Sequence, residues 1–324
     1  MYRNFCIGLA VLAAWTGTCV GAPAEMEQGD RLCLYVSSYH AGYYWSDGIE
    51  RELESTLEGA CKLEKFYMDT KRNYGTEFAE AKAMEAKQLI DRRHFDVVLA
   101  FGDDASKYLV IPYLKATETP VVFCGVNWTV AEYGFPYSNV TGTIEAAPDC
   151  EVVREARLIL GKVGGFAYVA ADVPARQKEL DRLKVVASEE GLQLKSYLVE
   201  TMEQWQAAFL AAQEFDFAIL GNPAGIPDWD AVAARTLVYA HTRCLTTTYS
   251  LYMRPYSVFS MVNTHLEQGN WSGEVARLIL SGRSPAGIPI ISNRRWDLFM
   301  NPALAEKIGV AMPAHILKMA LRIE

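Results

Sequence analysis

After its first 24 residues, the chain alternates short apolar runs with longer amphipathic segments. Leu32–Val36 and Asp96–Phe101 are two of the apolar runs, and each has the length of a strand. Between them, apolar residues recur every four positions at Ile49, Leu53 and Leu57, which is helical spacing. This alternation is typical of βαβ units, which build a parallel sheet with helices on its faces. We therefore predict an α/β fold.

The rhythm restarts near residue 166, which indicates two halves of similar topology. Phe95–Ala100 and Phe215–Leu220 both begin with Phe-Asp, run into an apolar stretch and stop near a glycine, Gly102 or Gly221. No linker rich in Pro, Ser or Gly divides the halves. We predict two Rossmann-like lobes with parallel sheets, joined by a hinge and separated by a cleft that suits a small molecule.

Length and charge limit the classes of protein that this chain can belong to. With 324 residues, half of them apolar, it can form two domains with sizeable cores. Its formal net charge is −8 and its pI is about 5.3. Nucleic acids and anionic membranes attract basic surfaces, so an acidic chain argues against both as partners.

The first 24 residues have the pattern of an export signal. Arg3 supplies positive charge, Phe5–Trp15 an apolar stretch, and Thr16–Ala24 the small residues that precede a cleavage site. We expect cleavage after Ala24 and release into the periplasm. A retained membrane anchor, or a lipoprotein formed at Cys19, is the alternative.

The cysteines do not have the spacing of a metal or redox motif. An odd number remains after the predicted leader, so at least one thiol is left over within the chain. Cys33 and Cys61 are expected on neighbouring strands, which allows a disulfide, and small buried side chains are the other interpretation for all of them. We predict no metal and no cofactor. The five residues are Cys33, Cys61, Cys124, Cys150 and Cys244.

The turn after the first strand contains four aromatic residues and a histidine, which is unusual for a plain connection. Aromatic rings at the carboxyl end of a strand can stack on a ligand, and Tyr and Trp add polar groups. Asp47 can hold a ligand ammonium or cap the following helix. The alternative is an aromatic plug that packs the loop onto its own sheet. The ligand-binding candidates in this turn are Tyr39, His40, Tyr43, Trp45 and Asp47.

Further candidates follow other strands, because ligands of parallel sheets bind beyond the carboxyl ends of the strands. Gly102 and Asp103 end one strand, and Asn127 and Trp128 follow the next. Local helix capping and turn chemistry explain such residues equally well. In the second half the candidates are Asp172, Asn222 and Tyr249.

Catalytic motifs are absent from the sequence. The five histidines are scattered, and none belongs to a nucleophile elbow or an HExxH motif. No glycine-rich phosphate loop of a common type occurs. We therefore predict a binding protein and not an enzyme.

Several stretches resemble the ABC-transporter substrate-binding family that includes tryptophan- and tyrosine-binding lipoproteins. The resemblance covers nearly all of the chain after the leader. It implies a type I periplasmic-binding fold with three crossings between lobes, a ligand held in the cleft, and closure about the hinge. It also implies lobes at 30–145 plus about 255–292 and at 146–254 plus about 293–324. The matching stretches are 38–49, 101–105, 122–128, 139–142, 276–285 and 301–310.

Two departures from that family concern the ligand. The aromatic first turn resembles members found beside sensory histidine kinases, and neither Asp172–Ala175 nor Gly221–Ala224 reproduces the pockets of the amino-acid binders. We expect a monomer that captures a small molecule, with an aromatic amino acid as the first expectation, and delivers it to an ABC permease. The alternative is an extracytoplasmic sensor that acts in trans on a membrane histidine kinase.

Overall fold

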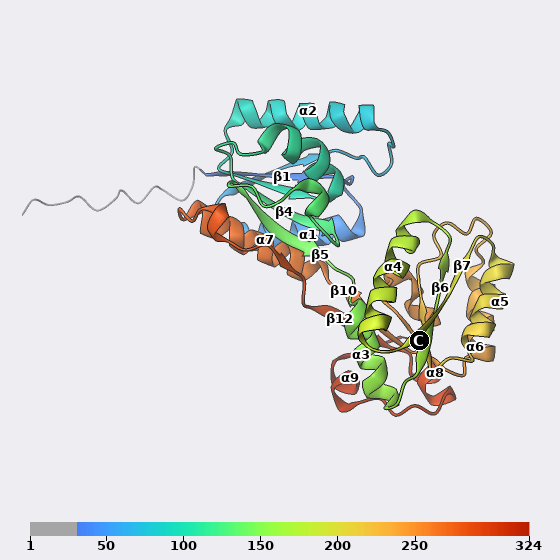
Figure 1. The fold of residues 1–324 in the computed structure, drawn as a ribbon. Coiled ribbons are helices and arrows are strands. Elements are labelled where there is room, and N and C mark those ends of the chain that lie inside the picture. Colours follow the sequence, from blue (N-terminus) through green and yellow to red (C-terminus); the bar gives the residue numbers. More distant parts are fainter. Residues whose placement is uncertain (1–30, 324) are drawn as a thin grey trace, which may run out of the picture.

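The computed structural model describes residues 31–323, so the predicted leader at 1–24 lies outside the described residues. Figure 1 shows two lobes, each built on its own sheet with helices on both sides. The first sheet has the order β11-β5-β4-β3-β1-β2, and all its strand pairs are parallel. Its strands are β1 (Leu32–Ser37), β2 (Lys62–Tyr67), β3 (Val97–Phe101), β4 (Val121–Asn127), β5 (Val140–Glu145) and β11 (Ile291–Ser292).

The second sheet has the order β13-β12-β10-β9-β8-β6-β7, and β12 runs antiparallel to β10. The prediction of two α/β lobes with mainly parallel sheets is confirmed. The strands of this sheet are β6 (Gly165–Ala171), β7 (Gln193–Val199), β8 (Phe217–Leu220), β9 (Leu245–Thr248), β10 (Phe259–Asn263), β12 (Trp296–Met300) and β13 (Leu321–Arg322).

Alternating side chains join each face of the first sheet to a different pair of helices. Cys33 and Tyr35 of β1 pack with α1 and α7, whereas Leu34 and Val36 pack with α2 and η1. All four side chains are fully buried. A parallel strand covered on both faces must be apolar throughout, which is why these runs are readable in the sequence. The helices are α1 (Tyr44–Leu57), α2 (Thr76–Arg93), the π-helix η1 (Ala105–Leu114) and α7 (His265–Leu280).

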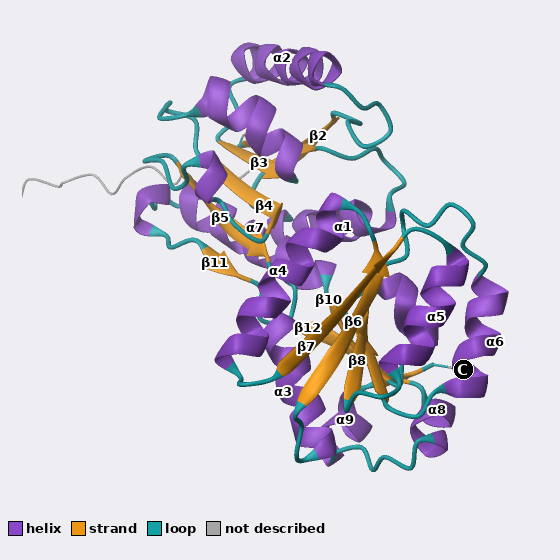
Figure 2. Cartoon of the chain, turned by 45° about the vertical axis from the view of Figure 1, so that its right-hand side comes forward, coloured by secondary structure: helices purple, strands orange, loops and turns teal. Residues whose placement is uncertain are grey.

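In the second lobe, helices flank a twisted sheet with a single core (Figure 2). The packing of α3 on α4 and of α5 on α6 places one pair on each side of the strands. The helices are α3 (Asp149–Leu160), α4 (Pro174–Glu189), α5 (Met202–Ala212), α6 (Ala231–His241), α8 (Pro302–Lys307) and α9 (Ala314–Met319). Short 3₁₀ turns are η2 (Ala131–Tyr133), η3 (Leu251–Tyr256) and η4 (Pro285–Gly287).

The chain passes between the two sheets three times, after β5, after β10 and after β11. β10 pairs with β9 and β12, so the chain returns to the first lobe after Asn263. That point lies later than the boundary near 255 expected from the sequence, because 259–262 is a buried run that completes the second sheet.

α1 packs closely on α7, and this contact completes the first lobe. In the sequence α1 precedes the second lobe and α7 follows most of it, so the contact joins two distant parts of the chain. A Cβ added at Gly269 would lie 2.6 Å from the backbone oxygen of Ile49, and one at Gly273 would lie 2.7 Å from Cβ of Thr56. Both distances are too short for real contacts, so the glycines set how closely the helices approach. A disulfide joins Cys33 of β1 to Cys61, which directly precedes β2.

We predict that Gly269→Ala lowers the free energy of unfolding by about 1–3 kcal/mol, because the new methyl meets backbone that cannot rotate away. Helix propensity alone would favour alanine by about 1 kcal/mol, so a loss must come from the contact with α1. Chemical denaturation measures the change. Glu274→Ala, an exposed substitution on the same helix, serves as the control. Stability equal to the control would contradict this account of the α1–α7 contact.

Candidate functional site

A cleft of about 880 Å³ is lined by side chains from both lobes. Its volume is within the range of small-molecule sites in proteins. The first lobe contributes Tyr39, Tyr43, Tyr44, Trp45, Asn127 and Glu145. The second lobe contributes Arg176, Asn222, Ala231, Ser250, Leu251, Tyr252, Arg254, Pro255 and Tyr256.

The aromatic wall of the cleft is built where β1 turns into α1. Gly42 has φ of +93°, a conformation that favours glycine, and its N–H donates to Oδ1 of Asp47 at 3.0 Å. This turn starts α1 at Tyr44 and presents the rings to the cleft. Tyr43 is 40% exposed and Tyr44 is 59% exposed, so both rings are accessible to a ligand.

The rings of this wall also contact one another and the start of α7. Tyr39 stacks on Tyr43 with centroids 4.6 Å apart. Tyr44 and Trp45 both meet His265 edge-on, at 5.6 and 5.9 Å. Tyr39 and Trp45 therefore pack against their own lobe as well as lining the cleft, whereas Tyr43 and Tyr44 are the more exposed rings of the wall.

Glu145 is the carboxylate of the first-lobe wall. Indole Nε1 of Trp45 donates to its Oε2 at 3.3 Å, and the side-chain amide of Asn263 donates to its Oε1 at 3.5 Å. Burial raises the pKa of Glu145 to about 7, the charge of Asp103 adds to that rise, and the two hydrogen bonds oppose it. Near neutral pH both the protonated and the ionised forms of this carboxyl are therefore populated.

The same carboxylate belongs to a chain of contacts that includes all three crossings. Glu145 ends β5 at the first crossing, and Asn263 ends β10 at the second. The amide of Asn293, at the third crossing, donates to Oδ1 of Asn263 at 3.3 Å. Oδ1 of Asn293 accepts from the N–H of Ala146 at 2.7 Å, so the series of contacts returns to the residue next to Glu145. A side chain of the cleft is thus hydrogen-bonded to the segments that connect the lobes.

On the second-lobe wall, a buried carboxylate holds Arg176 in place. The Arg176 guanidinium lies 2.5 Å from Oε1 of Glu179, which is almost fully buried. Tyr168 donates to Oε2 of Glu179 at 2.6 Å, and Tyr249 donates to the same oxygen at 3.4 Å. Burial raises the pKa of Glu179, whereas Arg176 lowers it. Arg176 is therefore a fixed cation on the wall of the cleft.

Five of the twelve residues predicted for the site line the cleft, and the remaining first-lobe candidates lie beside it. Asp103 accepts from the side-chain amide of Asn127 at 2.7 Å, so it positions an asparagine that lines the cleft. His40 Nδ1 lies 3.7 Å from a carboxylate oxygen of Asp69. Gly102 has φ of +87° and packs against Ser38 and Tyr39. The five lining residues are Tyr39, Tyr43, Trp45, Asn127 and Asn222.

The other candidates take part in contacts around the cleft. The ring of Trp128 lies under the Arg182 guanidinium at 4.4 Å, which joins the first lobe to α4 of the second. Asp172 accepts from the side-chain amide of Gln177 at 2.7 Å, which is local turn chemistry. Tyr249 bonds to Glu179, as described above.

Sequence reasoning missed Glu145, Arg176 and the turn at 250–256. Glu145 ends β5, so the rule that ligands bind beyond strand ends could have found it. Arg176 lies in the first turn of α4, which follows the end of β6. The segment Leu251–Tyr256 has no helical or strand periodicity that could have marked it.

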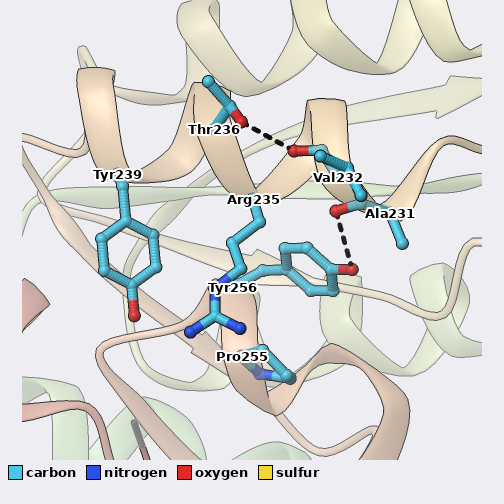
Figure 3. A pocket seen from close by; sticks show the side chains of 7 residues that line it. All are labelled: Ala231, Val232, Arg235, Thr236, Tyr239, Pro255 and Tyr256. Carbon is cyan, nitrogen blue, oxygen red and sulfur yellow. Dashed lines mark hydrogen bonds between the residues drawn. The ribbon is translucent and has the colours of Figure 1, made fainter.

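A smaller hollow of about 470 Å³ adjoins the cleft on the second lobe (Figure 3). It shares Ala231, Pro255 and Tyr256 with the cleft. The Tyr256 hydroxyl donates to the backbone oxygen of Ala231 at 3.3 Å, which joins η3 to the start of α6. The cleft therefore continues over the surface between these two elements.

Residues 31–323 contain no group of three or more His, Cys, Asp and Glu side chains that could hold a metal ion. Within the same residues, no helix has the length and apolar character needed to cross a membrane.

Comparisons with known proteins identify a family and a fold. A family model described as ABC transporter substrate binding protein matches residues 46–323. No curated protein sequence matches the chain.

Solved structures with this architecture include three bacterial binding proteins. One is an ABC domain in complex with L-Trp from Streptococcus pneumonia, with TM-score 0.58 and 14% identity over 91% of this chain and 100% of that one. A ligand-free, open substrate-binding protein from Clostridium difficile has TM-score 0.72 and 13% identity over 91% and 99%. A periplasmic ribose ABC transporter protein from Conexibacter woesei has TM-score 0.54 and 12% identity over 91% and 99%. At these identities the likeness shows the fold.

We predict that Glu145→Gln changes the pH dependence of stability. The folded protein holds the Glu145 proton more tightly than the unfolded chain does, because its pKa rises from 4.5 to about 7. Its stabilising effect is therefore full below pH 4.5 and is lost as the pH rises to about 7. At about 1.36 kcal/mol per pKa unit the loss is at most roughly 3 kcal/mol, and water in the cleft lowers it to on the order of 1–3 kcal/mol.

The measurement is the free energy of unfolding of wild type and Glu145→Gln between pH 4.5 and 8. The wild type should lose stability relative to the variant as the pH rises. Glu77→Gln, an exposed substitution on α2, should follow the wild type at every pH. Parallel curves for wild type and Glu145→Gln would show that Glu145 has the same pKa folded and unfolded.

Proposed function

This chain belongs to the ABC transporter substrate-binding protein family, and we propose that it captures a small molecule in the cleft between its lobes and delivers it to an ABC importer. The observation that carries the proposal is that both lobes contribute polar and aromatic side chains to one cleft. A molecule that contacts both walls stabilises the arrangement in which the walls are close. We propose binding and release, without chemical turnover.

The chemistry of the walls favours a ligand with a planar ring and polar groups of both kinds. Tyr43, Tyr44 and Tyr252 are exposed rings that line the cleft, and a planar group can stack on such rings. Arg176 is suited to a carboxylate, and Glu145 faces the cleft from the other lobe. An aromatic amino acid or a related compound meets these demands, and one structural neighbour holds L-Trp.

Closure about the three crossings would transmit binding to the rest of the molecule. A ligand that contacts Glu145 or Trp45 contacts the hydrogen-bonded chain that runs through Asn263 and Asn293. Binding would then favour one lobe angle over others, and that lobe angle would present a surface to the permease.

The proposed location is the periplasm, after removal of the leader at 1–24. The disulfide between Cys33 and Cys61 supports this location, because such bonds persist in oxidising compartments. We propose that the exported protein acts as a monomer with the ABC permease as its partner.

The experiment that tests the proposed function is a thermal-shift screen of residues 25–324 against amino acids, nucleosides, sugars and small organic acids. A ligand at about 100 times its Kd should stabilise the native state by roughly 2.7 kcal/mol, which raises Tm by several degrees. Deletion of the gene should then abolish uptake of that compound by cells. Binding with unchanged uptake would overturn delivery to an importer and favour the sensory alternative. Breakdown of the compound by the protein would overturn binding without turnover.

We predict that Tyr44→Ala weakens binding of the compound found in the screen by roughly 1–3 kcal/mol, because an open ring face of the cleft is lost. Tyr74→Ala is the matched control: Tyr74 is 87% exposed and lies outside the cleft, whereas Tyr44 is 59% exposed and lines it. Both variants should keep the Tm of the ligand-free protein. Calorimetric titration compares the affinities, and equal affinity for the two variants would remove Tyr44 from the binding site.

A further inference from the structure

Glu145 is held in a fixed place on the first-lobe wall of the cleft. Its backbone pairs with Asn127 of β4, and its backbone oxygen accepts from the N–H of Trp128 at 3.0 Å. Its side chain is partly buried and lines the cleft. A ligand that enters the cleft therefore meets this carboxylate without any rearrangement of the strand that carries it.

The carboxylate of Glu145 has no cationic partner. Among residues 31–323, no lysine, arginine or histidine forms an ion pair with it. Arg176 of the opposite wall is paired with Glu179, and Lys71, beside the aromatic wall, is paired with Asp104. An ionised carboxylate that is partly removed from water is unfavourable without a counter-charge. A cation supplied by a ligand would therefore stabilise it.

The hydrogen bonds of the Glu145 side chain leave part of its acceptor capacity unused. It accepts from the Trp45 indole at 3.3 Å and from the Asn263 amide at 3.5 Å. Both donors are neutral, and both distances exceed the usual value of about 3.0 Å. A carboxylate has about four acceptor positions, whereas an ammonium has three donors and no acceptor. An ammonium is thus complementary to what Glu145 still offers.

Aromatic rings accompany this carboxylate. Tyr43, Tyr44 and Trp45 line the cleft together with Glu145. Burial and, after it, the charge of Glu145 raise the pKa of the Tyr43 hydroxyl, which indicates that the two groups are close. The faces of aromatic rings attract cations, and rings beside a carboxylate are the chemistry that recognises an alkyl ammonium.

The other carboxylate of this turn is less well placed. Asp47, considered for a ligand ammonium from the sequence, does not line the cleft. Its Oδ1 accepts from the N–H of Gly42 at 3.0 Å, within the turn that starts α1. Glu145 is therefore the better placed of the two carboxylates.

We propose that Glu145 selects a ligand that carries a cationic amine next to an aromatic ring, and that this amine becomes the counter-ion of its carboxylate. The proposal rests on the proposed function, because it concerns the ligand of the same cleft. The amine donates to the unused acceptor positions of Glu145, and the ring contacts the aromatic wall. The end of the ligand that bears the amine therefore faces the first lobe.

Calorimetric titration of residues 25–324 with tryptamine and tryptophol at pH 8 tests the proposal. The two probes share the indole and the two-carbon chain, and they differ in having an ammonium or a hydroxyl. We expect tryptamine to bind about tenfold more tightly, because hydrogen bonds between charged groups are stronger. Glu145→Gln should abolish this preference, and Glu77→Gln, an exposed substitution on α2, should retain it. Absence of tryptamine binding, or equal binding of the two probes by the wild type, would overturn the proposal.

Two further variants locate the amine. Tyr44→Ala should weaken both probes, and probes that it leaves unaffected bind outside the cleft, which would overturn the proposal. Loss of the preference in Asp47→Asn but not in Glu145→Gln would assign the amine to Asp47 and would also overturn it. The screen and the uptake assay decide the proposed function separately. A neutral or anionic compound that binds in the cleft and is imported would leave that function intact without selection of an amine.

The pH dependence of wild-type binding tests the proposal without any variant. A proton and the amine compete for the carboxylate, so the affinity for tryptamine should rise from pH 5 to about 7 and level off above that. The rise is at most about tenfold per pH unit, and tryptamine stays cationic throughout because alkylamines titrate near pH ~10. The affinity for tryptophol should not rise. A constant affinity for tryptamine over this range would overturn the proposal.

Other groups around Glu145 do not produce this profile. Burial raises the pKa values of three of them, which stay neutral in this range: Tyr39, Tyr43 and Cys124. The pKa of His265, which contacts the indole of Trp45, is lowered by burial from 6.5. The other charged groups near Glu145 or on the walls of the cleft are Asp103, Arg176 and Arg254. A pH dependence caused by His265 would persist in Glu145→Gln, whereas one caused by Glu145 would be absent. Persistence of the full rise in that variant would overturn the proposal.

Discussion

The hydrogen bonds that connect Glu145, Asn263 and Asn293 are the interaction on which the arrangement of the lobes depends. Each residue comes from a different crossing, so the three connecting segments are held together by side chains and not only by chain continuity. Polar groups in such a place are unfavourable unless each has a partner, and here amide and carboxyl groups satisfy one another. The addition of Trp45 to this network joins the connection between the lobes to the aromatic wall of the cleft.

Fixed charge is distributed differently on the two walls of the cleft. Glu179 is buried in the second lobe and fixes the position of Arg176 on the wall of the cleft. The cation is therefore in place before any ligand arrives. Pre-organised groups of this kind lose little conformational freedom on binding. Glu145 has a pKa of about 7 and can adapt its charge to what approaches it. One wall is therefore electrostatically constant, and the other responds to proton concentration.

The sequence predicts the fold more fully than the site, for a physical reason. Leu34 and Val36 must be apolar because helices cover both faces of β1, and that demand is local and readable. The partners of Glu145 are not local: Asn263 lies 118 residues away, and only the folded chain brings them together. The rule of strand ends found Asn127 and Asn222, but it says nothing about 3₁₀ turns such as η3, which have no periodic pattern.

A contact outside the crossings also bears on the lobe angle. Trp128 of the first lobe lies under the guanidinium of Arg182 on α4, and Arg182 in turn donates to the buried Asp149 at 2.7 Å. Trp128 adopts φ of +63°, which is costly for a residue with a Cβ and persists where surrounding contacts hold it. Asp149 begins α3, directly after the first crossing. The contact of Trp128 with Arg182 and the first crossing therefore both involve the start of α3. A rotation of the lobes that disturbs one must disturb the other.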